Sequence, residues 1–203
     1  MNRFDQIAKE WDAKPRRLLL ANKISEAIKK EVNLNKEHNV IDIGTGTGLL
    51  LMHLVLDVKH ITGVDNSQGM LNMLKEKAEN TGLNNIGYLL FDADKDSLSE
   101  NQYDLAVSSM TFHHFSDPAG FLEEVYRSLK PGGKICIGDL DKEDGTFHSD
   151  NEAVDVKHFG FEKDVFNIWL KNAGFKDTKV EVVFEIDKNE KKYPVFLAYG
   201  EKK

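Results

Sequence analysis

The chain has 203 residues and a net charge of −7, with 27 lysine and arginine against 34 aspartate and glutamate residues. This length suits one domain of roughly 200 residues, and the single cysteine, Cys136, excludes a disulfide framework and favours a reducing compartment. No cluster of lysine and arginine is present, which argues against nucleic acid as a partner. No apolar run reaches the ~20 residues that cross a bilayer and the N-terminus is polar, so we predict a cytoplasmic protein without a membrane span.

Two amphipathic segments open the chain, and Pro15 separates them. The second carries an apolar stripe from Leu20 to Ile28. The first has apolar residues at helical spacing, which are Phe4, Ile7, Ala8 and Trp11. Two interpretations stay open for residues 1–34: a helical cover over a sheet edge, or a lid over a ligand crevice with Trp11 as its apolar cover.

Between residues 35 and 140, short β-branched runs alternate with segments of helical periodicity. Helical spacing runs from Met70 to Ala78 and from Phe121 to Leu129, and Pro131–Gly133 predicts a turn into the next strand. The predicted strands are residues 39–43, 60–64, 86–90, 103–108 and 134–138. Repeated strand–helix alternation predicts an α/β fold, with a parallel sheet and helices on both faces.

The last part of the chain, residues 141–203, predicts a loop, a helix and a hairpin. The segment from Asp139 to Phe161 shows no helix or strand pattern, and a helix follows over residues 162–172 with Val165, Ile168 and Trp169 facing inward. Residues 178–186 and 194–199 read as strands whose connection is too short for a crossover. We therefore predict a single domain over residues 1–203, with a mostly parallel sheet that includes one antiparallel strand.

The most informative motif joins the first strand to a helix and contains Gly44, Gly46 and Gly48. Gly44 permits a tight turn, Gly46 lets a ligand approach the backbone, and Gly48 allows close packing of helix against strand. The following helix start offers free N–H groups to an anion. A dinucleotide-binding motif would place the third glycine at the position of Leu49, so an NAD-dependent oxidoreductase is the weaker alternative.

Acidic residues stand at the ends of the second and third strands. Asp65 could accept two hydrogen bonds from a ribose diol, or cap the next helix together with Ser67. Asp92 could meet an exocyclic amine, or be a solvated loop residue. The carboxyl ends of parallel strands share one edge of a sheet, so these residues should lie near the glycine motif.

The order of these motifs resembles that of class I S-adenosylmethionine-dependent methyltransferases, over about residues 36–140. It is most similar to the small-molecule branch that includes the ubiquinone/menaquinone-biosynthesis enzymes. The motifs that carry the resemblance are Asp42–Leu49, Val64-Asp65, Asp92-Ala93, Tyr103–Ser109, Phe112–Phe115 and Leu129–Lys134. The resemblance implies a Rossmann-like, seven-stranded sheet whose last-but-one position is filled by the antiparallel strand.

The resemblance also implies S-adenosylmethionine as cofactor, S-adenosylhomocysteine as product and a small-molecule methyl acceptor. It places Gly44, Thr45, Gly46 and Ser108 at the methionine portion, Asp65 at the ribose, and Met70, Asp92 and Ala93 at the adenine, with Asp42 and Asn66 completing the cofactor set.

Methyl transfer to a hydroxyl, an amine or an acidic carbon benefits from a base, and histidine is the commonest base near neutral pH. His113 and His114 follow the fourth strand, and Asp139 lies at the end of the fifth. We predict these three as catalytic candidates, with a packing role as the alternative for the histidines. The long loop and the N-terminal segment should form the substrate pocket, for which the predicted residues are Trp11, Asp141, His148 and His158.

The leading prediction is methyl transfer to a small molecule by in-line displacement, and the alternative of a different class is a non-catalytic S-adenosylmethionine sensor. No metal is predicted, because no pair of the histidines and acids has the helical spacing of a strong ligand motif. The acidic stretch from Asp139 to Asp155 predicts a neutral or cationic acceptor. A monomer or a homodimer is expected, with the hairpin edge near Val180–Phe184 as a possible contact.

Overall fold

The computed structural model describes residues 3–148 and 155–203. Within these ranges one sheet has seven strands in the order β3-β2-β1-β4-β5-β7-β6. The strands are β1 (Asn39–Ile43), β2 (His60–Asp65), β3 (Ile86–Leu90), β4 (Tyr103–Ser109), β5 (Leu129–Leu140), β6 (Lys176–Lys188) and β7 (Lys191–Glu201). β7 runs antiparallel to β5 and β6, and the remaining pairs are parallel. The predicted fold class, including the antiparallel strand in the last-but-one position, is confirmed.

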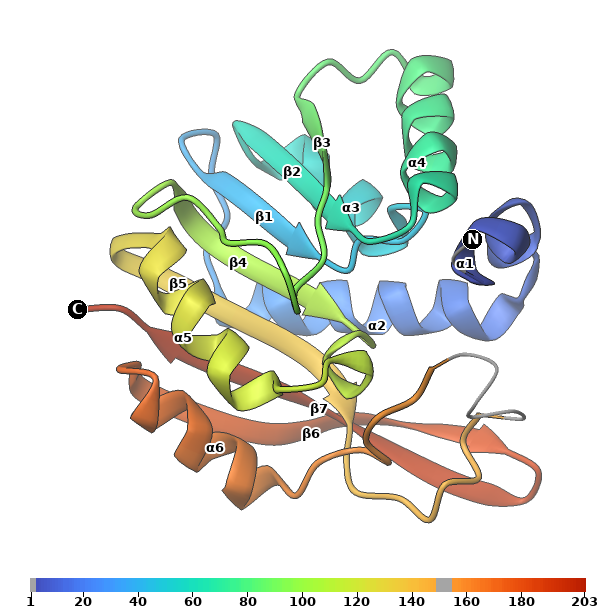
Figure 1. Cartoon of the computed structure of the whole chain (residues 1–203), viewed down its shortest axis with the longest axis vertical. Helices are drawn as coiled ribbons and strands as arrows, with labels where there is room; N and C mark the ends of the chain where they lie inside the picture. Colours follow the sequence, from blue (N-terminus) through green and yellow to red (C-terminus); the bar gives the residue numbers. More distant parts are fainter. Residues whose placement is uncertain (1–2, 149–154) are drawn as a thin grey trace.

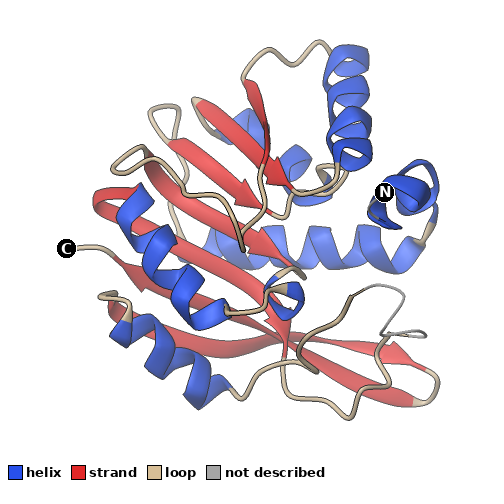
Figure 2. Ribbon diagram, in the orientation of Figure 1, coloured by secondary structure: helices blue, strands red, loops and turns tan. Residues whose placement is uncertain are grey.

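Helices cover both faces of the sheet (Figures 1 and 2). In the view of Figure 1, α5 and α6 lie in front of the sheet and α2 lies behind it. The helical elements are α1 (Arg3–Ile7), η1 (Ala8–Ala13), α2 (Pro15–Glu31), α3 (Leu49–Leu54), η2 (Val55–Asp57), α4 (Gln68–Thr81), η3 (Phe112–His114), α5 (Pro118–Ser128) and α6 (Lys163–Asn172).

The apolar side chains of the strands belong to two core clusters, one on each face of the sheet. On β1, Val40 packs with residues of α2, α3 and α4, whereas Ile41 and Ile43 pack with those of α5 and α6. Side chains alternate between the faces of a strand, so a strand covered on both sides must be apolar at nearly every position. This double burial explains the continuous apolar runs of the sequence.

The hairpin of β6 and β7 is longer than its apolar pattern predicts. Its strands continue through charged pairs, including Lys188 with Lys191, to a turn at Asn189 and Glu190. Both turn residues have positive φ, 52° and 63° respectively, as a two-residue hairpin loop requires. The charged side chains of this extension are mostly exposed, so hydrophobic alternation gives no sign of it.

Two other boundaries differ from the prediction for identifiable reasons. β5 begins at Leu129, because the Gly132 N–H donates to the Lys202 carbonyl at 2.6 Å and the Lys202 N–H donates to the Gly133 carbonyl at 2.8 Å. The N-terminal segment is α-helical only as far as Ile7 and continues as the 3₁₀ turns of η1 up to the proline at the start of α2.

The predicted inward face of α6 is wrong for Val165 and Ile168, whereas Trp169 is partly buried against the core as predicted. Phe166 and Leu170 are buried in the core, whereas Val165 and Ile168 are exposed. Phe166 stacks against Phe196 of β7 with ring centroids 5.2 Å apart, and this contact sets the rotation of the helix. Local periodicity allowed either stripe, and the aromatic partners on the sheet decided between them.

No helix within the described ranges combines the length and the apolar character needed to cross a bilayer.

Candidate active site

The carboxyl ends of β1 to β4 open into one cavity of about 260 Å³. The sheet order proceeds from β1 to β2 on one side and to β4 on the other, which leaves a crevice between the diverging connections. Parts of η1, α2 and the Phe147-His148 segment form the remaining walls. The predicted site residues that line this cavity are Trp11, Asp42, Gly44, Thr45, Gly46, Asp65, Asn66, Met70, Asp92, Ala93, His113, His114 and His148.

Each glycine of the β1–α3 motif meets a different steric demand. Gly44, Gly46 and Gly48 all have positive φ, a conformation in which a side chain is strained. A Cβ atom on Gly44 would overlap the Thr111 side chain, and one on Gly48 would overlap Leu74 of α4. Gly48 therefore admits a neighbouring helix rather than the strand contact that we predicted. A Cβ atom on Gly46 would meet only Trp11 Nε1, at 3.9 Å, so the backbone there stays open to a ligand.

Asp65, the last residue of β2, is bound to the glycine motif. Its Oδ2 accepts the Gly46 N–H at 2.8 Å, and its Oδ1 accepts the Ser67 N–H at 2.9 Å. Burial raises the pKa of Asp65 despite these hydrogen bonds. Each carboxylate oxygen keeps a lone pair, so the group can still accept hydrogen bonds from a diol in the cavity.

Asp42 is a second buried carboxylate beneath the same motif. Its Oδ2 accepts the Thr45 hydroxyl at 2.7 Å. Burial raises the pKa of Asp42 from 3.8 to about 7, opposed by the Thr45 hydrogen bond and reinforced by the charge of Asp65. The carboxyl group is therefore partly protonated at neutral pH when the cavity is empty.

We expect this raised pKa to make the protein less stable as pH increases from 4 to 7. Below the unfolded pKa both states are protonated, whereas above it the folded state holds a proton that the unfolded state has lost. Urea unfolding at pH 5 and pH 8 should show that Asp42→Asn gains stability relative to wild type as pH rises. Asp92→Asn is the control, because the Lys95 hydrogen bond lowers the pKa of Asp92 below this window and the difference from wild type should stay constant. An unchanged difference for Asp42→Asn would contradict the assignment.

The adenine-side candidates lie at the start of α4 and after β3. Met70 is 1% exposed, and its N–H donates to the Ser67 side chain that caps the helix. Asp92 forms an ion pair with Lys95 and its N–H donates to Asp96, so its carboxylate is not free in the apo protein. The Asp92 carbonyl is engaged as well, since it accepts the N–H groups of Lys95 and Asp96 at 2.9 and 2.8 Å. Of the two predicted residues, Ala93 is therefore the one whose backbone is better placed to meet a base edge.

Ser108 does not line the cavity. It is fully buried, and its hydroxyl donates to the Ile43 carbonyl at 2.8 Å inside the sheet. Ser109 and Thr111, directly after it, line the cavity instead. The prediction that Ser108 lies beside the ligand is therefore wrong by one position. Successive side chains of a strand point to opposite faces, so Ser109 lines the cavity and Ser108 does not.

His113 and Asp139 form a buried dyad. His113 Nδ1 lies 2.6 Å from Asp139 Oδ1, and the two side chains are 1% and 0% exposed. Burial opposes ionisation of Asp139, but the charge and hydrogen bond of His113 and the N–H of Leu140 outweigh it and lower the pKa of the carboxyl group. Asp139 itself does not line the cavity, whereas His113 does, and His113 Nε2 has no hydrogen-bond partner among the described residues. Asp139, which we predicted as a catalytic candidate, is therefore buried against His113 and does not face the cavity.

Two more histidines surround this dyad. The rings of His114 and His148 lie 4.2 Å and 5.2 Å from that of His113. Burial and the nearby charges of His113 and His114 lower the pKa of His148 to about 3, so its ring is neutral. Phe4 packs edge-on against His114 at 5.6 Å, which joins the N-terminal helix to this cluster.

Asp141 and His158 also lie outside the cavity lining. Asp141 forms an ion pair with Lys163 at the start of α6, and its N–H donates to the Pro194 carbonyl. His158 Nε2 lies 3.0 Å from the Phe115 carbonyl, and the His158 N–H donates to the carbonyl of His113. Both residues hold the long loop against the sheet. We predicted them as pocket residues, and this prediction is wrong. Residues 149–154 of that loop lie outside the described residues.

The N-terminal segment is attached to the cofactor side of the cavity. Asp5 accepts the Ser67 hydroxyl and the Gly69 N–H, at 2.7 and 2.8 Å. Asp12 accepts the Thr47 hydroxyl at 2.6 Å and forms an ion pair with Lys77. These contacts lie over the β1–α3 motif and α4, which supports the lid interpretation over that of a sheet-edge cover.

Among the side chains of the cavity wall that sequence reasoning missed are Arg16, Arg17 and Phe147. The Arg17 guanidinium stacks 3.3 Å from the centre of the Trp11 ring and donates to the Trp11 carbonyl at 2.8 Å. The Arg16 guanidinium lies 5.3 Å from the centre of the Phe147 ring. The sequence did contain a sign that these arginines differ from the other basic residues of the helix. They are adjacent and follow Pro15 directly, whereas the other basic residues of α2 are lysines.

Within residues 3–148 and 155–203, no three His, Cys, Asp or Glu side chains are placed so that they could bind a metal ion together.

Comparison with known proteins agrees with this geometry. Residues 41–137 match a family model described as a methyltransferase domain. An uncharacterised methyltransferase of Schizosaccharomyces pombe is 29% identical over 155 residues, which cover 70% of this chain and 55% of that protein. The ubiquinone biosynthesis O-methyltransferase of Coxiella burnetii is 28% identical over 144 residues, which cover 69% of this chain and 61% of that protein. The crystal structure of a SAM-dependent methyltransferase from Aquifex aeolicus matches with a TM-score of 0.71 and 27% identity, over 97% of both chains.

The chain spans less than two thirds of the length of these two curated relatives. The match nevertheless includes the β1–α3 motif and the ends of β2 to β4, which are the parts that form the cavity. It decides against the NAD-dependent alternative. Residues 41–137 match a methyltransferase domain, and the motif series, the sheet order and the Aquifex aeolicus structure show that the chain has the fold of the class I S-adenosylmethionine-dependent methyltransferases.

Proposed function

We propose that the protein transfers a methyl group from S-adenosylmethionine to a small-molecule acceptor. The cofactor supplies a methyl group already activated on a sulfonium, so the protein has chiefly to align the acceptor and to exclude water. The cavity supports a small acceptor, because its volume is about 260 Å³ and residues of α1, η1 and the Phe147-His148 segment line it opposite the strand ends. The similarity to a ubiquinone biosynthesis O-methyltransferase supports the same class of acceptor.

In this proposal the cofactor occupies the side of the cavity between the β1–α3 motif and the ends of β2 and β3. Asp65 would accept the ribose hydroxyls, and the open backbone at Gly46 would adjoin the methionine portion. Arg17, stacked on Trp11 above the same loop, would bind the amino-acid carboxylate of the cofactor. Met70, Asn66 and the Asp92-Ala93 backbone would surround the adenine.

The proposed base is His113, and one observation carries this assignment. Its Nε2 is buried, lacks a hydrogen-bond partner among the described residues and belongs to a side chain of the cavity wall. Its Nδ1 is held by the Asp139 carboxylate, which leaves Nε2 free to accept a proton from an acceptor hydroxyl, amine or acidic carbon. Asp139 acts as a positioning residue, because it contacts His113 and not the cavity.

The direct test is to follow S-adenosylhomocysteine formation with separated candidate acceptors. The protein and S-adenosylmethionine would be incubated with the low-molecular-weight filtrate of a cell extract, with its protein fraction and with its RNA. We expect product only with the filtrate. Product with protein or RNA would overturn the small-molecule assignment. Tight S-adenosylhomocysteine binding without turnover in any fraction would instead favour a sensor.

A further inference from the structure

The cavity contains two cationic side chains that have no acidic partner. Arg16 and Arg17 both line it, at the start of α2. Among residues 3–148 and 155–203, neither guanidinium forms an ion pair with a carboxylate. This is unusual in a chain with a net charge of −7, in which acidic groups outnumber basic ones. Unpaired cations on a cavity wall indicate an anionic ligand.

The acidic stretch near the cavity does not supply the missing negative charge. Asp141 is paired with Lys163, Asp144 with Lys191 at 2.7 Å, and Asp155 with Lys157 at 2.6 Å. Asp139 is buried against His113. Four of the five described acids of this stretch are therefore compensated locally. The fifth, Glu143, forms no ion pair with a described residue, and its Oε2 accepts the N–H groups of Thr146 and Phe147 at 2.8 and 3.1 Å. The negative charge of the stretch is thus smaller than that implied by its composition, which led us to predict a neutral or cationic acceptor. Positions 150 and 152 lie outside the described residues.

The two arginines serve different ends of the cavity. Arg17 stacks on Trp11, whose Nε1 is the nearest group to the open face of Gly46, so Arg17 belongs to the cofactor end. Burial and the neighbouring Arg16 lower the pKa of Arg17 to about 10, yet the group stays protonated at neutral pH. S-adenosylmethionine has a single carboxylate, which Arg17 can satisfy. The charge of Arg16 then has no counterpart on the cofactor.

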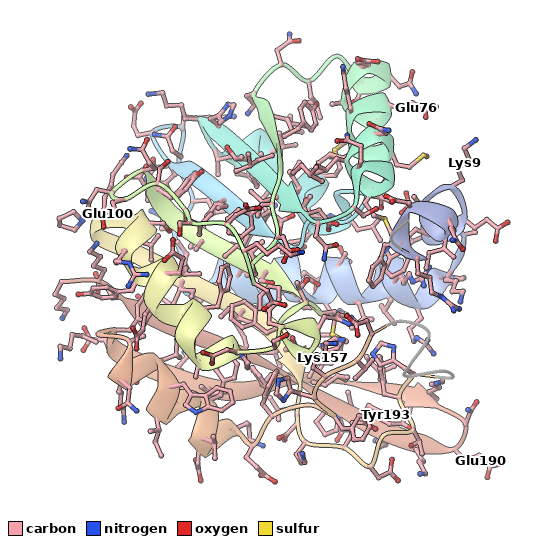
Figure 3. The ribbon with its side chains drawn as sticks, viewed as in Figure 1. Lys9, Glu76, Glu100, Lys157, Glu190 and Tyr193 are labelled. Carbon is pink, nitrogen blue, oxygen red and sulfur yellow. The ribbon has the colours of Figure 1, made fainter. Side chains whose placement is uncertain are left out.

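Arg16 faces an aromatic surface that is fixed in place. Phe147 is 3% exposed and packs edge-on against Tyr193 at 5.3 Å, and the Tyr193 hydroxyl lies 2.7 Å from the Thr146 hydroxyl. Figure 3 labels Tyr193 near the closed end of the β6–β7 hairpin. Lys188, on the same hairpin, lies 5.7 Å from the centre of the Phe147 ring. Burial and then the charge of Arg16 lower the pKa of Lys188, so the two cations share one neighbourhood.

We propose that the methyl acceptor carries an anionic group, either a carboxylate or a phosphate monoester, and that Arg16 binds this group beside the ring of Phe147. The proposal rests on the methyltransferase function proposed above. A guanidinium presents a planar fork of donors that matches the oxygens of both anions. Leu20, Ala21 and Met110 line the cavity as well, so the acceptor should join this anion to an apolar body.

The test compares probes that share a phenyl ring and differ in the group attached to it; benzoate and benzamide are matched in shape and differ in charge. Benzoate, phenyl phosphate and the uncharged benzamide would be titrated calorimetrically into protein saturated with S-adenosylhomocysteine. We expect at least one anion to bind about 10-fold or more tightly than benzamide, as a charge-assisted hydrogen bond allows. The stronger of the two anions distinguishes a carboxylate from a phosphate acceptor. Arg16→Gln should abolish the preference, and Arg16→Lys should retain part of it.

Lys14→Gln is the matched control. It removes the same charge two residues away, from an exposed side chain outside the cavity lining, and should preserve the anion preference. Equal binding of anions and benzamide, no binding of either anion, or an intact preference in Arg16→Gln would each overturn the proposal. Failure of S-adenosylhomocysteine itself to bind would contradict the methyltransferase function instead, so the two failures are distinguishable.

Discussion

An Asp65→Ala variant should lose about 100-fold or more in affinity for S-adenosylhomocysteine. The carboxylate is expected to accept both ribose hydroxyls, and two hydrogen bonds to a charged group contribute about 3 kcal/mol or more. The same substitution removes the acceptor of the Gly46 N–H, so the β1–α3 motif loses one of its contacts with β2 and keeps the hydrogen bond from the Thr45 N–H to the Val64 carbonyl. Isothermal titration with S-adenosylhomocysteine measures the effect.

Loss of folding is not the expected cause of this result. Burial raises the pKa of Asp65, which means that the ionised carboxylate is costly in the folded protein and its removal relieves that cost. Thermal unfolding of the apo variant should therefore remain close to that of wild type. Asp92→Ala, at the end of the adjacent strand, is the comparison variant and should weaken binding far less, because Asp92 is already paired with Lys95. Unchanged affinity in Asp65→Ala would refute the ribose role.

A His113→Gln variant should lose about 10² to 10⁴ in turnover, the usual contribution of a general base. Its affinity for S-adenosylhomocysteine should change little, because His113 is assigned to the acceptor rather than to the cofactor. The acid limb of the pH–rate profile, which reports protonation of the base, should disappear in this variant. Steady-state rates of S-adenosylhomocysteine release between pH 5 and 9 would measure both effects with any acceptor found in the filtrate.

Two further variants separate a base from a packing residue. Asp139→Asn should lower turnover as well, since the amide no longer fixes the tautomer of His113 in which Nε2 is the acceptor. His114→Gln is the matched control: the His114 ring lines the same cavity, but its Nδ1 lies 3.1 Å from the Asp155 carbonyl, whereas that of His113 lies beside the Asp139 carboxylate, so loss of His114 should leave the acid limb intact. A His113→Gln variant that keeps both turnover and the acid limb would remove His113 from the mechanism.

The structure suggests how the two halves of the site are linked. Asp5 and Asp12 attach the N-terminal segment to α4 and to the β1–α3 motif, on the cofactor side. Arg16 and Phe4 of the same segment reach the acceptor side, at Phe147 and His114. One short stretch of chain therefore contacts both proposed subsites. Closure over the cofactor and formation of the acceptor pocket would then be a single event.

The cofactor side of this protein could be predicted from the sequence because its information is local. Gly44, Gly46 and Asp65 follow directly after strands that their apolar, β-branched composition identifies. Parallel strands bring their carboxyl ends to one edge, so correct strand assignment alone places these residues together. The antiparallel hairpin could be predicted for the same reason, since a short connection permits no crossover.

The acceptor side depended on contacts between distant segments. Arg16 lies beside Phe147, and His113 beside Asp139. The residues of each pair are far apart in the sequence, so hydrophobic periodicity does not predict their contact. Asp139, predicted as a catalytic candidate, is buried in the structure. Asp141, predicted as a pocket residue, forms an ion pair with Lys163. Lysines pair with Asp141, Asp144 and Asp155, and composition alone does not record these pairings. Spacing and composition thus determined the fold and the cofactor edge, whereas the pairing of charges and rings, which depends on three-dimensional proximity, was decided only by the tertiary structure.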